Sequence, residues 1–170
     1  MTEIVEGDLT FAFPDHCEAD KYDEWSFCLN QFQSVAGGSK AVDIVCISDD
    51  SAWLIEVKDH RQHPRTKLVD IDDELAGKAR DTLAGLAAAS ANANNQDERA
   101  LARRALRKRR WRVALHLEQP GATSRLRPQP FDVANILSRI RNSRKLKAVD
   151  AHPVILAREE NRPGIPWTAR

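Results

Sequence analysis

The hydrophobic positions are densest in two short runs, residues 41–48 and 52–57, with a polar SerAspAspSer segment at their junction. Both runs are rich in β-branched and aromatic residues, and the polar segment is typical of a tight turn. The pattern predicts a β-hairpin. If the turn is centred on Asp49 and Asp50, Ser48 faces Ser51 and Asp43 lies directly opposite Glu56.

Apolar residues recur at helical spacing in several other segments. We expect helices over residues 14–33, 71–89, 97–110 and 131–147. Residues 90–96 are low in apolar bulk, so they form a loop before the third of these helices or continue the second.

Further strands are expected at residues 111–118, where apolar and polar residues alternate, and at 152–159. Residues 1–13 form an edge strand or an arm. This order of elements predicts an α/β fold with a three-layer α/β/α core around a central mixed sheet. We expect a single domain over residues 1–170, with its core at about 15–157.

The tail, residues 158–170, is too rich in proline for regular structure. It is expected to dock through Trp167 or to bind a partner.

Three charged residues interrupt the apolar hairpin. Carboxylates directly across an antiparallel pair lie about 5 Å apart and repel each other, so Asp43 and Glu56 require a cation. Lys58 projects from the same face as Glu56 because side chains alternate along a strand. A divalent ion with oxygen ligands supplies the positive charge, whereas an ordinary ion pair between Glu56 and Lys58 is the alternative.

These residues resemble the PD-(D/E)XK nuclease superfamily, also called restriction-endonuclease-like. Asp43 fits the aspartate of the motif, with Val42 in place of its proline, and Glu56-Val57-Lys58 fits the (D/E)XK element. The resemblance implies a restriction-endonuclease-like fold and a Mg²⁺-dependent nuclease that hydrolyses phosphodiester bonds. It favours a DNA endonuclease of bacterial defence or of a mobile element.

The resemblance also implies roles for individual residues. Asp43, Glu56 and the backbone carbonyl of Val57 would hold Mg²⁺, with Mn²⁺ able to substitute, and Lys58 would orient the attacking water. Glu18 is a further candidate, because superfamily members often carry an acidic residue on the first helix. A local capping role for Asp15 and Glu18 is the alternative.

The net charge of +1 conceals a strong asymmetry. Residues 1–99 contain 9 Lys+Arg and 20 Asp+Glu, whereas residues 100–170 contain 17 and 5. Basic clusters of this density favour nucleic acid, with DNA preferred over RNA; neutralisation of the acidic half by the basic half is the alternative. The first cluster is the candidate nucleic-acid-binding set: Arg103, Arg104, Arg107, Lys108, Arg109, Arg110 and Arg112.

Other features exclude some classes of protein. Three cysteines without CxxC spacing indicate core thiols rather than a disulfide framework or a zinc site. The absence of an apolar run of about 20 residues argues against a membrane protein and for a cytoplasmic one. A homodimer, a subunit active only with a partner protein, and a nucleic-acid-binding module without chemistry remain alternatives to a self-sufficient enzyme.

Overall fold

A five-stranded sheet forms the centre of the protein. The computed structural model describes residues 1–170 except 64, 67–68, 122–129, 143 and 159, so positions 143 and 159 of the expected last helix and last strand lie outside the described residues. The strand order is β3-β4-β5-β6-β7, with antiparallel pairing from β3 to β5 and parallel pairing from β5 to β7. The predicted α/β class and mixed sheet are thereby confirmed. The strands are β3 (Glu18–Lys21), β4 (Ile44–Ser48), β5 (Ser51–Asp59), β6 (Arg110–Glu118) and β7 (Val154–Leu156).

The hairpin of β4 and β5 has the predicted register. Ser48 pairs with Ser51 and Ile44 pairs with Ile55, as expected for a turn centred on Asp49 and Asp50. Val45 and Leu54 face the helices, while Ile44 and Ile55 belong to the cluster on the opposite face. Both faces of the hairpin are therefore buried, as its apolar runs indicated.

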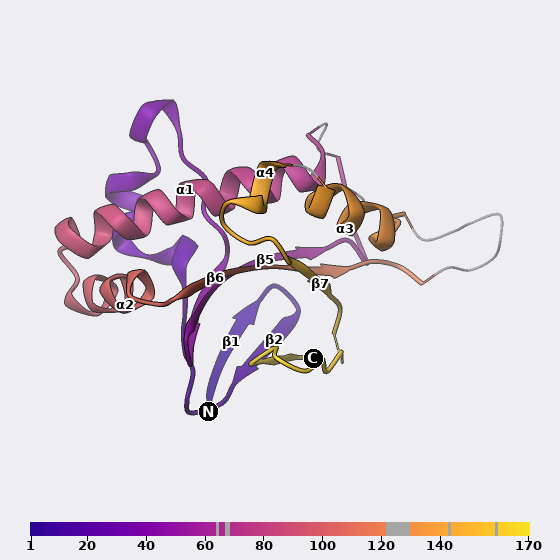
Figure 1. Ribbon diagram of the computed structural model, residues 1–170, viewed down its shortest axis with the longest axis horizontal. Helices are drawn as coiled ribbons and strands as arrows, with labels where there is room; N and C mark the ends of the chain where they lie inside the picture. Colours follow the sequence, from indigo (N-terminus) through magenta and orange to yellow (C-terminus); the bar gives the residue numbers. More distant parts are fainter. Residues whose placement is uncertain (64, 67–68, 122–129, 143, 159) are drawn as a thin grey trace.

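Helices cover one face of this sheet (Figure 1). Leu75 and Leu86 of α1 pack with Leu101 of α2, Ile140 of α3 and Leu146 of α4 in the same apolar cluster as the sheet. Asn95 caps α2, because its side chain accepts hydrogen bonds from the N–H groups of Asp97 and Glu98. Helix α1 continues to Asn92, and residues 93–95 form the loop between the two helices. The helices are α1 (Ile71–Asn92), α2 (Gln96–Leu106), α3 (Val133–Asn142) and α4 (Arg144–Lys147).

A second, three-stranded sheet covers the other face. It has the order β1-β2-β8, with β1 (Thr2–Glu6), β2 (Leu9–Phe13) and β8 (Thr168–Ala169). Leu9, Phe11 and Phe13 alternate along β2 and are fully buried against residues of β4 and β5. The expected α/β/α layering is wrong in this respect, because the second outer layer is a sheet rather than helices.

The C-terminal tail is part of this sheet. Trp167 is buried and packs edge-on against Trp53, with ring centroids 5.1 Å apart. The expected docking through Trp167 is confirmed. The tail is not wholly irregular, since its last residues pair with β2.

The helix expected over residues 14–33 is wrong for most of its length. Its first part is strand β3, which pairs along the open edge of β4, and it is followed by a 3-10 turn (Tyr22–Glu24) and a short π-helix (Cys28–Phe32). A second 3-10 turn (Val35–Gly37) completes the segment. A helix at Glu18–Lys21 would leave the backbone groups along that edge of β4 without partners, which is costly for a buried strand.

Cys17, Cys28 and Cys46 are buried free thiols, as expected. Among the helices that the structure describes, none is both long enough and apolar enough to cross a membrane.

Candidate functional site

Asp43 and Glu56 come together at the end of the hairpin. Asp43 immediately precedes β4 and is buried, and its Oδ2 accepts the backbone N–H of Val57 at 2.6 Å. This bond fixes the aspartate beside Glu56, which is 1% exposed. The predicted proximity of these two carboxylates is thus confirmed.

Lys58 lies on the same face and forms an ion pair with Glu56. Its Nζ is also 3.4 Å from Glu74 Oε1, and Glu74 in turn accepts from Arg65 Nη2 at 2.7 Å. Glu74 lies in the first turn of α1. The ion pair between Glu56 and Lys58, given as the alternative to a metal site, is therefore present and extends to the helix.

Lys78 completes this cluster from α1. Its Nζ lies 2.7 Å from Glu56 Oε1 and 3.4 Å from Asp43 Oδ1. Thr82, one helical turn after Lys78, is fully buried and its hydroxyl accepts the N–H of Val42 at 3.0 Å. Lys78 and Thr82 are one helical turn apart and therefore share a face of α1. This spacing is the feature of the sequence that could have placed both of them toward the strands.

Burial and charge shift the protonation of this cluster. Burial, followed by the neighbouring Asp43 carboxylate, raises the pKa of Glu56 to about 7, although Lys78 and Lys58 oppose the shift. Burial alone would lower the pKa of Lys78, but the carboxylates of Glu56 and Asp43 outweigh it, and its pKa is raised. The raised pKa favours the charged form of Lys78 beside the two carboxylates.

One more acid lies close enough to be affected. Asp23, in the 3-10 turn after β3, has its pKa raised to about 6 by burial and then by the charge of Asp43. Asp23 is not among the candidate site residues, and the helix expected over residues 14–33 does not form around it. Asp23 lies near Asp43 because the 3-10 turn directly follows β3, which pairs with β4.

The expected magnesium site comprises the carboxylates of Asp43 and Glu56 and the backbone carbonyl of Val57. Within the described part of the chain, no group of three or more His, Cys, Asp or Glu side chains that could hold a metal ion is found. The ammonium groups of Lys58 and Lys78 already supply the positive charge that the two carboxylates need. Mg²⁺ and Mn²⁺, with Val57 as a backbone ligand, stay predictions of the sequence.

Glu18 lies away from this cluster. It begins β3, pairs with Ile47 near the turn of the hairpin, and forms a two-pronged ion pair with Arg104 of α2. The expected role beside Asp43 required a helix at this position, whereas the strand places Glu18 at the opposite end of β4. The structure therefore corrects its placement.

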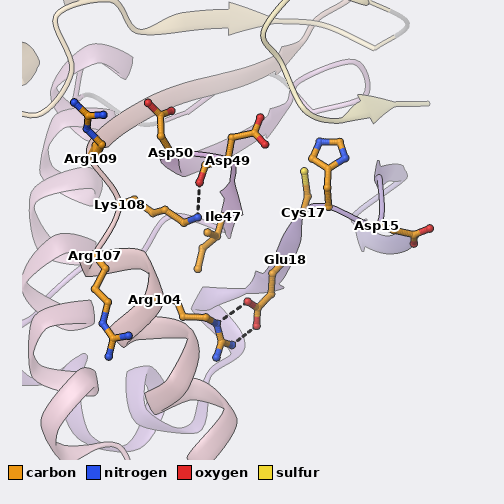
Figure 2. Close-up of a pocket in the computed structure, with 11 residues that line it drawn as sticks. Asp15, Cys17, Glu18, Ile47, Asp49, Asp50, Arg104, Arg107, Lys108 and Arg109 are labelled. Atoms are coloured by element: carbon orange, nitrogen blue, oxygen red, sulfur yellow. Dashed lines mark hydrogen bonds and ion pairs between the residues drawn. The ribbon is translucent and has the colours of Figure 1, made fainter.

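Glu18 instead lines a pocket of about 570 Å³ between β3, the turn of the hairpin and the end of α2 (Figure 2). The pocket is lined by both positively and negatively charged side chains. The basic residues come from the candidate nucleic-acid-binding set and the acidic ones from the first half of the chain: Arg104, Arg107, Lys108, Arg109, Asp15, Glu18, Asp49 and Asp50.

Much of the basic set is engaged within the chain. Arg103 donates to the carbonyl of Ser90, Lys108 to the carbonyl of Asp49, and Arg110 lies 3.5 Å from Asp50. Arg112 stacks over the ring of Trp53 and pairs with Asp150 at 3.3 Å. The ion pairs of Arg110 with Asp50 and of Arg104 with Glu18 support the alternative that the basic half neutralises the acidic half.

Arg107 and Arg109 differ from their neighbours. Both are exposed, both line the pocket, and among the described residues neither side chain has an ion pair or a hydrogen bond. They follow α2 in the short connection to β6, whose backbone is held by bonds from the N–H groups of Arg109 and Arg110 to the carbonyl of Asp50. Their guanidinium groups are therefore available to a ligand on a fixed backbone.

The sequence is similar to a cysteine–tRNA ligase of Neisseria meningitidis serogroup A, with 35% identity over 167 residues, covering 81% of this chain and 24% of the ligase. The chain thus spans about a quarter of the length of this relative. No family model matches the sequence. No solved structure matches it.

This similarity overturns the identification made from the motif. The relative is a ligase rather than a phosphodiesterase, so the assignment to the PD-(D/E)XK superfamily and the expected nuclease activity are wrong. The alternatives of a partner-dependent subunit and a binding module without chemistry gain no support from it either. Asp43, Glu56 and Lys58 satisfied a short pattern, but in the structure they join Lys78 in a network of ion pairs.

Proposed function

We propose that this chain functions in tRNA metabolism, as a domain that contacts tRNA in a setting like that of a cysteine–tRNA ligase. The observation that carries the proposal is the 35% identity to such a ligase along most of this chain. Because the chain matches only a quarter of the relative, the proposal concerns recognition of tRNA and assigns no ligation step to these residues.

The pocket beside α2 supplies a physical basis for this contact. Arginine guanidinium groups bind phosphate through paired, charge-assisted hydrogen bonds. Arg107 and Arg109 are exposed and without partners in the described part of the chain, whereas Arg104 is neutralised by Glu18. Arg107 and Arg109 would therefore hold the phosphate backbone of the RNA.

The buried cluster would serve a different purpose. Lys78 joins α1 to the hairpin through Asp43 and Glu56, and Lys58 joins β5 to Glu74 at the start of the same helix. These bonds fix the helical layer on the sheet. We assign the cluster a structural role, with α2 and its arginines positioned through the packing of α1 against α2.

RNA in place of DNA reverses the preference expected from the sequence. A homodimer or a partner protein stays a prediction, as does a cytoplasmic location. Neither is needed for the contact proposed at Arg107 and Arg109.

The test is the affinity of the purified chain for tRNA, measured by fluorescence anisotropy with duplex DNA of similar length as competitor. Wild-type protein should bind tRNA, and Arg107→Glu with Arg109→Glu should weaken binding at least about tenfold, because each reversal replaces an attraction to phosphate by a repulsion. Arg141→Glu is the matched control, since Arg141 is exposed on α3, which covers the same face of the sheet as α2 but lies at the other end of the molecule from the pocket (Figure 1).

Absence of tRNA binding by the wild type would overturn the proposed function. Equal losses in the pocket variant and in Arg141→Glu would overturn the placement of the contact. Displacement of tRNA by duplex DNA at similar concentrations would show that the surface binds phosphate without selecting RNA, which also contradicts the proposal.

A further inference from the structure

Strand β1 has one edge without a strand partner among the described residues. It lies at the end of the three-stranded sheet, with β2 between it and β8 (Figure 1). An open edge presents a row of backbone N–H and C=O groups to which another chain can add, so proteins usually cover or blunt such edges. The edge of β1 is therefore a place where an extended segment of another molecule can pair.

The hydrogen bonds of β2 show which groups of β1 face this edge. Thr10 exchanges backbone bonds with Arg170, at 2.9 and 3.0 Å, so its N–H and C=O groups point away from β1. Thr10 is the register partner of Val5, and opposite residues of an antiparallel pair alternate between bonded and non-bonded pairs. The backbone groups of Val5, and those of Glu3 two residues earlier, therefore point outward. Within the described part of the chain, neither residue has a backbone partner on that side.

The neighbouring edge of β3 is less open. Tyr22 donates its N–H to the carbonyl of Asp43 at 2.9 Å, so the residue before it, Lys21, turns its N–H to the outer edge. The carboxylate of Asp20 accepts that N–H at 2.9 Å. A side chain of β3 thus occupies an outward donor of its own edge, whereas the outward donors of β1 remain accessible.

Residues 2–5 of β1 line a groove of about 570 Å³. Its other walls are β3, the 3-10 turn after β3 and the start of α2. Among the described residues that line this edge groove, five are acidic and Lys21 is the single basic one. The acidic residues are Glu3, Asp20, Glu24, Asp97 and Glu98.

Three of these carboxylates have no counter-ion among the described residues. Asp97 is exposed in the first turn of α2, and its side chain has no ion pair there. Asp20 and Glu98 accept hydrogen bonds from neutral donors, which leave their charge uncompensated. Glu3 and Glu24 each pair with a basic side chain. The edge groove therefore favours a positively charged occupant.

We propose that the edge of β1 binds an extended basic peptide, which adds a fourth strand to the small sheet and places lysine or arginine side chains in the edge groove. In strand addition, main-chain hydrogen bonds supply affinity and the pockets for alternate side chains supply specificity. Every second residue of the peptide faces the groove, because side chains alternate along a strand. This inference does not rest on the proposed function, since it uses neither Arg107 nor Arg109.

The test uses a labelled, capped octapeptide of alternating lysine and threonine, with binding measured by fluorescence anisotropy. Wild-type protein should bind it at least about tenfold more tightly than the alternating peptide of glutamate and threonine, because the groove attracts one and repels the other. A second control is the lysine peptide with two central threonines replaced by proline. It keeps the charge but loses the N–H groups that pair, and should bind at least about fivefold more weakly.

Amide hydrogen exchange shows where the peptide pairs. The N–H groups of Glu3 and Val5 should exchange at least about tenfold more slowly when the peptide is bound, because the added strand accepts from them. The N–H of Asp8, in the exposed turn between β1 and β2, should not change.

Two pairs of variants separate the backbone from the charge. Val5→Pro removes one outward N–H and should weaken binding about fivefold, whereas Val5→Thr keeps this N–H and should bind like the wild type. Asp97→Asn should weaken the lysine peptide about two- to fivefold. Asp49→Asn is its control, because Asp49 is also exposed but does not line the edge groove. Circular dichroism confirms that each variant is folded.

Equal binding of the lysine and glutamate peptides overturns the proposal, as does equal binding of the proline peptide or unchanged binding by Val5→Pro. Slow exchange of Glu3 and Val5 without peptide, together with a doubled mass in light scattering, assigns the edge to a second copy of this chain and also overturns it. Binding of tRNA is measured on the same preparation, so failure of the peptide site leaves the proposed function standing.

Discussion

The ammonium group of Lys78 lies 2.7 Å from the carboxylate of Glu56, although the two residues belong to different layers of the fold. Glu56 is on the central strand β5, and Lys78 is in the second turn of α1. The contact places a cation where two carboxylates meet, which is the electrostatic requirement that the sequence set for this hairpin. The cation is a lysine side chain of this protein rather than a bound metal ion.

Replacing Lys78 by methionine should therefore destabilise the protein. The variant keeps the aliphatic length but leaves Asp43 and Glu56 buried with less positive charge, and removing one partner of a buried ion pair costs about 3 kcal/mol. Urea unfolding measures this loss. Arg80→Met is the control, because Arg80 is largely exposed two residues further along α1 and should change the free energy of unfolding by less than about 0.5 kcal/mol. Equal effects of both substitutions would contradict the structural role of Lys78.

The raised pKa of Glu56 predicts a dependence of stability on pH. The folded protein retains a proton on Glu56 between pH 4.5 and about 7, where the unfolded chain has released it. This contribution to stability is present below pH 4.5 and is lost as the pH rises through about 7.

Glu56→Gln cannot titrate, so its free energy of unfolding should rise relative to that of the wild type as the pH increases through this window. Urea unfolding of both proteins at about pH 5 and at about pH 8 measures the difference, and groups common to both proteins cancel. A difference that stays constant, or that changes in the opposite sense, would show that burial does not raise the pKa of Glu56 in solution.

Glu98 is expected to hold the irregular segment after β3. Its buried carboxylate accepts from the N–H of Ser26 at 2.8 Å, from the Ser26 hydroxyl at 2.9 Å and from the N–H of Phe27 at 3.1 Å. Glu98→Gln places a donor against one of these donors and should cost about 2 kcal/mol in chemical unfolding. Asp97→Asn, at the exposed neighbouring position, should cost far less, and a comparable loss would argue for a general effect at the start of α2.

The hairpin could be predicted from the sequence because two local signals agree on it. The SerAspAspSer turn fixes which residues pair, and a register once fixed determines every opposite pair along both strands. Ser48 pairs with Ser51 as a result, and Asp43 lies beside Glu56. The length and position of α1 followed in the same way from its long apolar repeat.

Residues 14–33 could not be predicted in this way. Tyr22, Trp25, Leu29 and Phe32 have helical spacing, yet the residues before them form β3 because the open edge of β4 offers backbone partners. That advantage depends on a contact between segments about 25 residues apart, and no local pattern contains it. The position of Glu18 beside Arg104 depends on the same pairing.

The misassigned activity has a related cause. An aspartate and an ExK element across a hairpin specify which charges meet, but they do not specify what neutralises them. Lys78 follows the motif by about 20 residues and reaches it only because α1 packs on the sheet. Ion pairing and catalysis therefore share one sequence pattern here, and the similarity to a tRNA ligase corrected the choice between them.

The salt dependence of tRNA binding tests the central claim most directly. Each contact of an arginine with phosphate releases counterions, so the slope of log affinity against log salt concentration counts these contacts. Wild-type protein should show a clear negative slope, and Arg107→Ala with Arg109→Ala should make it shallower by about 2, or about 1 for each arginine. A slope unchanged by the double substitution, or no measurable affinity of the wild type for tRNA at low salt, would contradict the account.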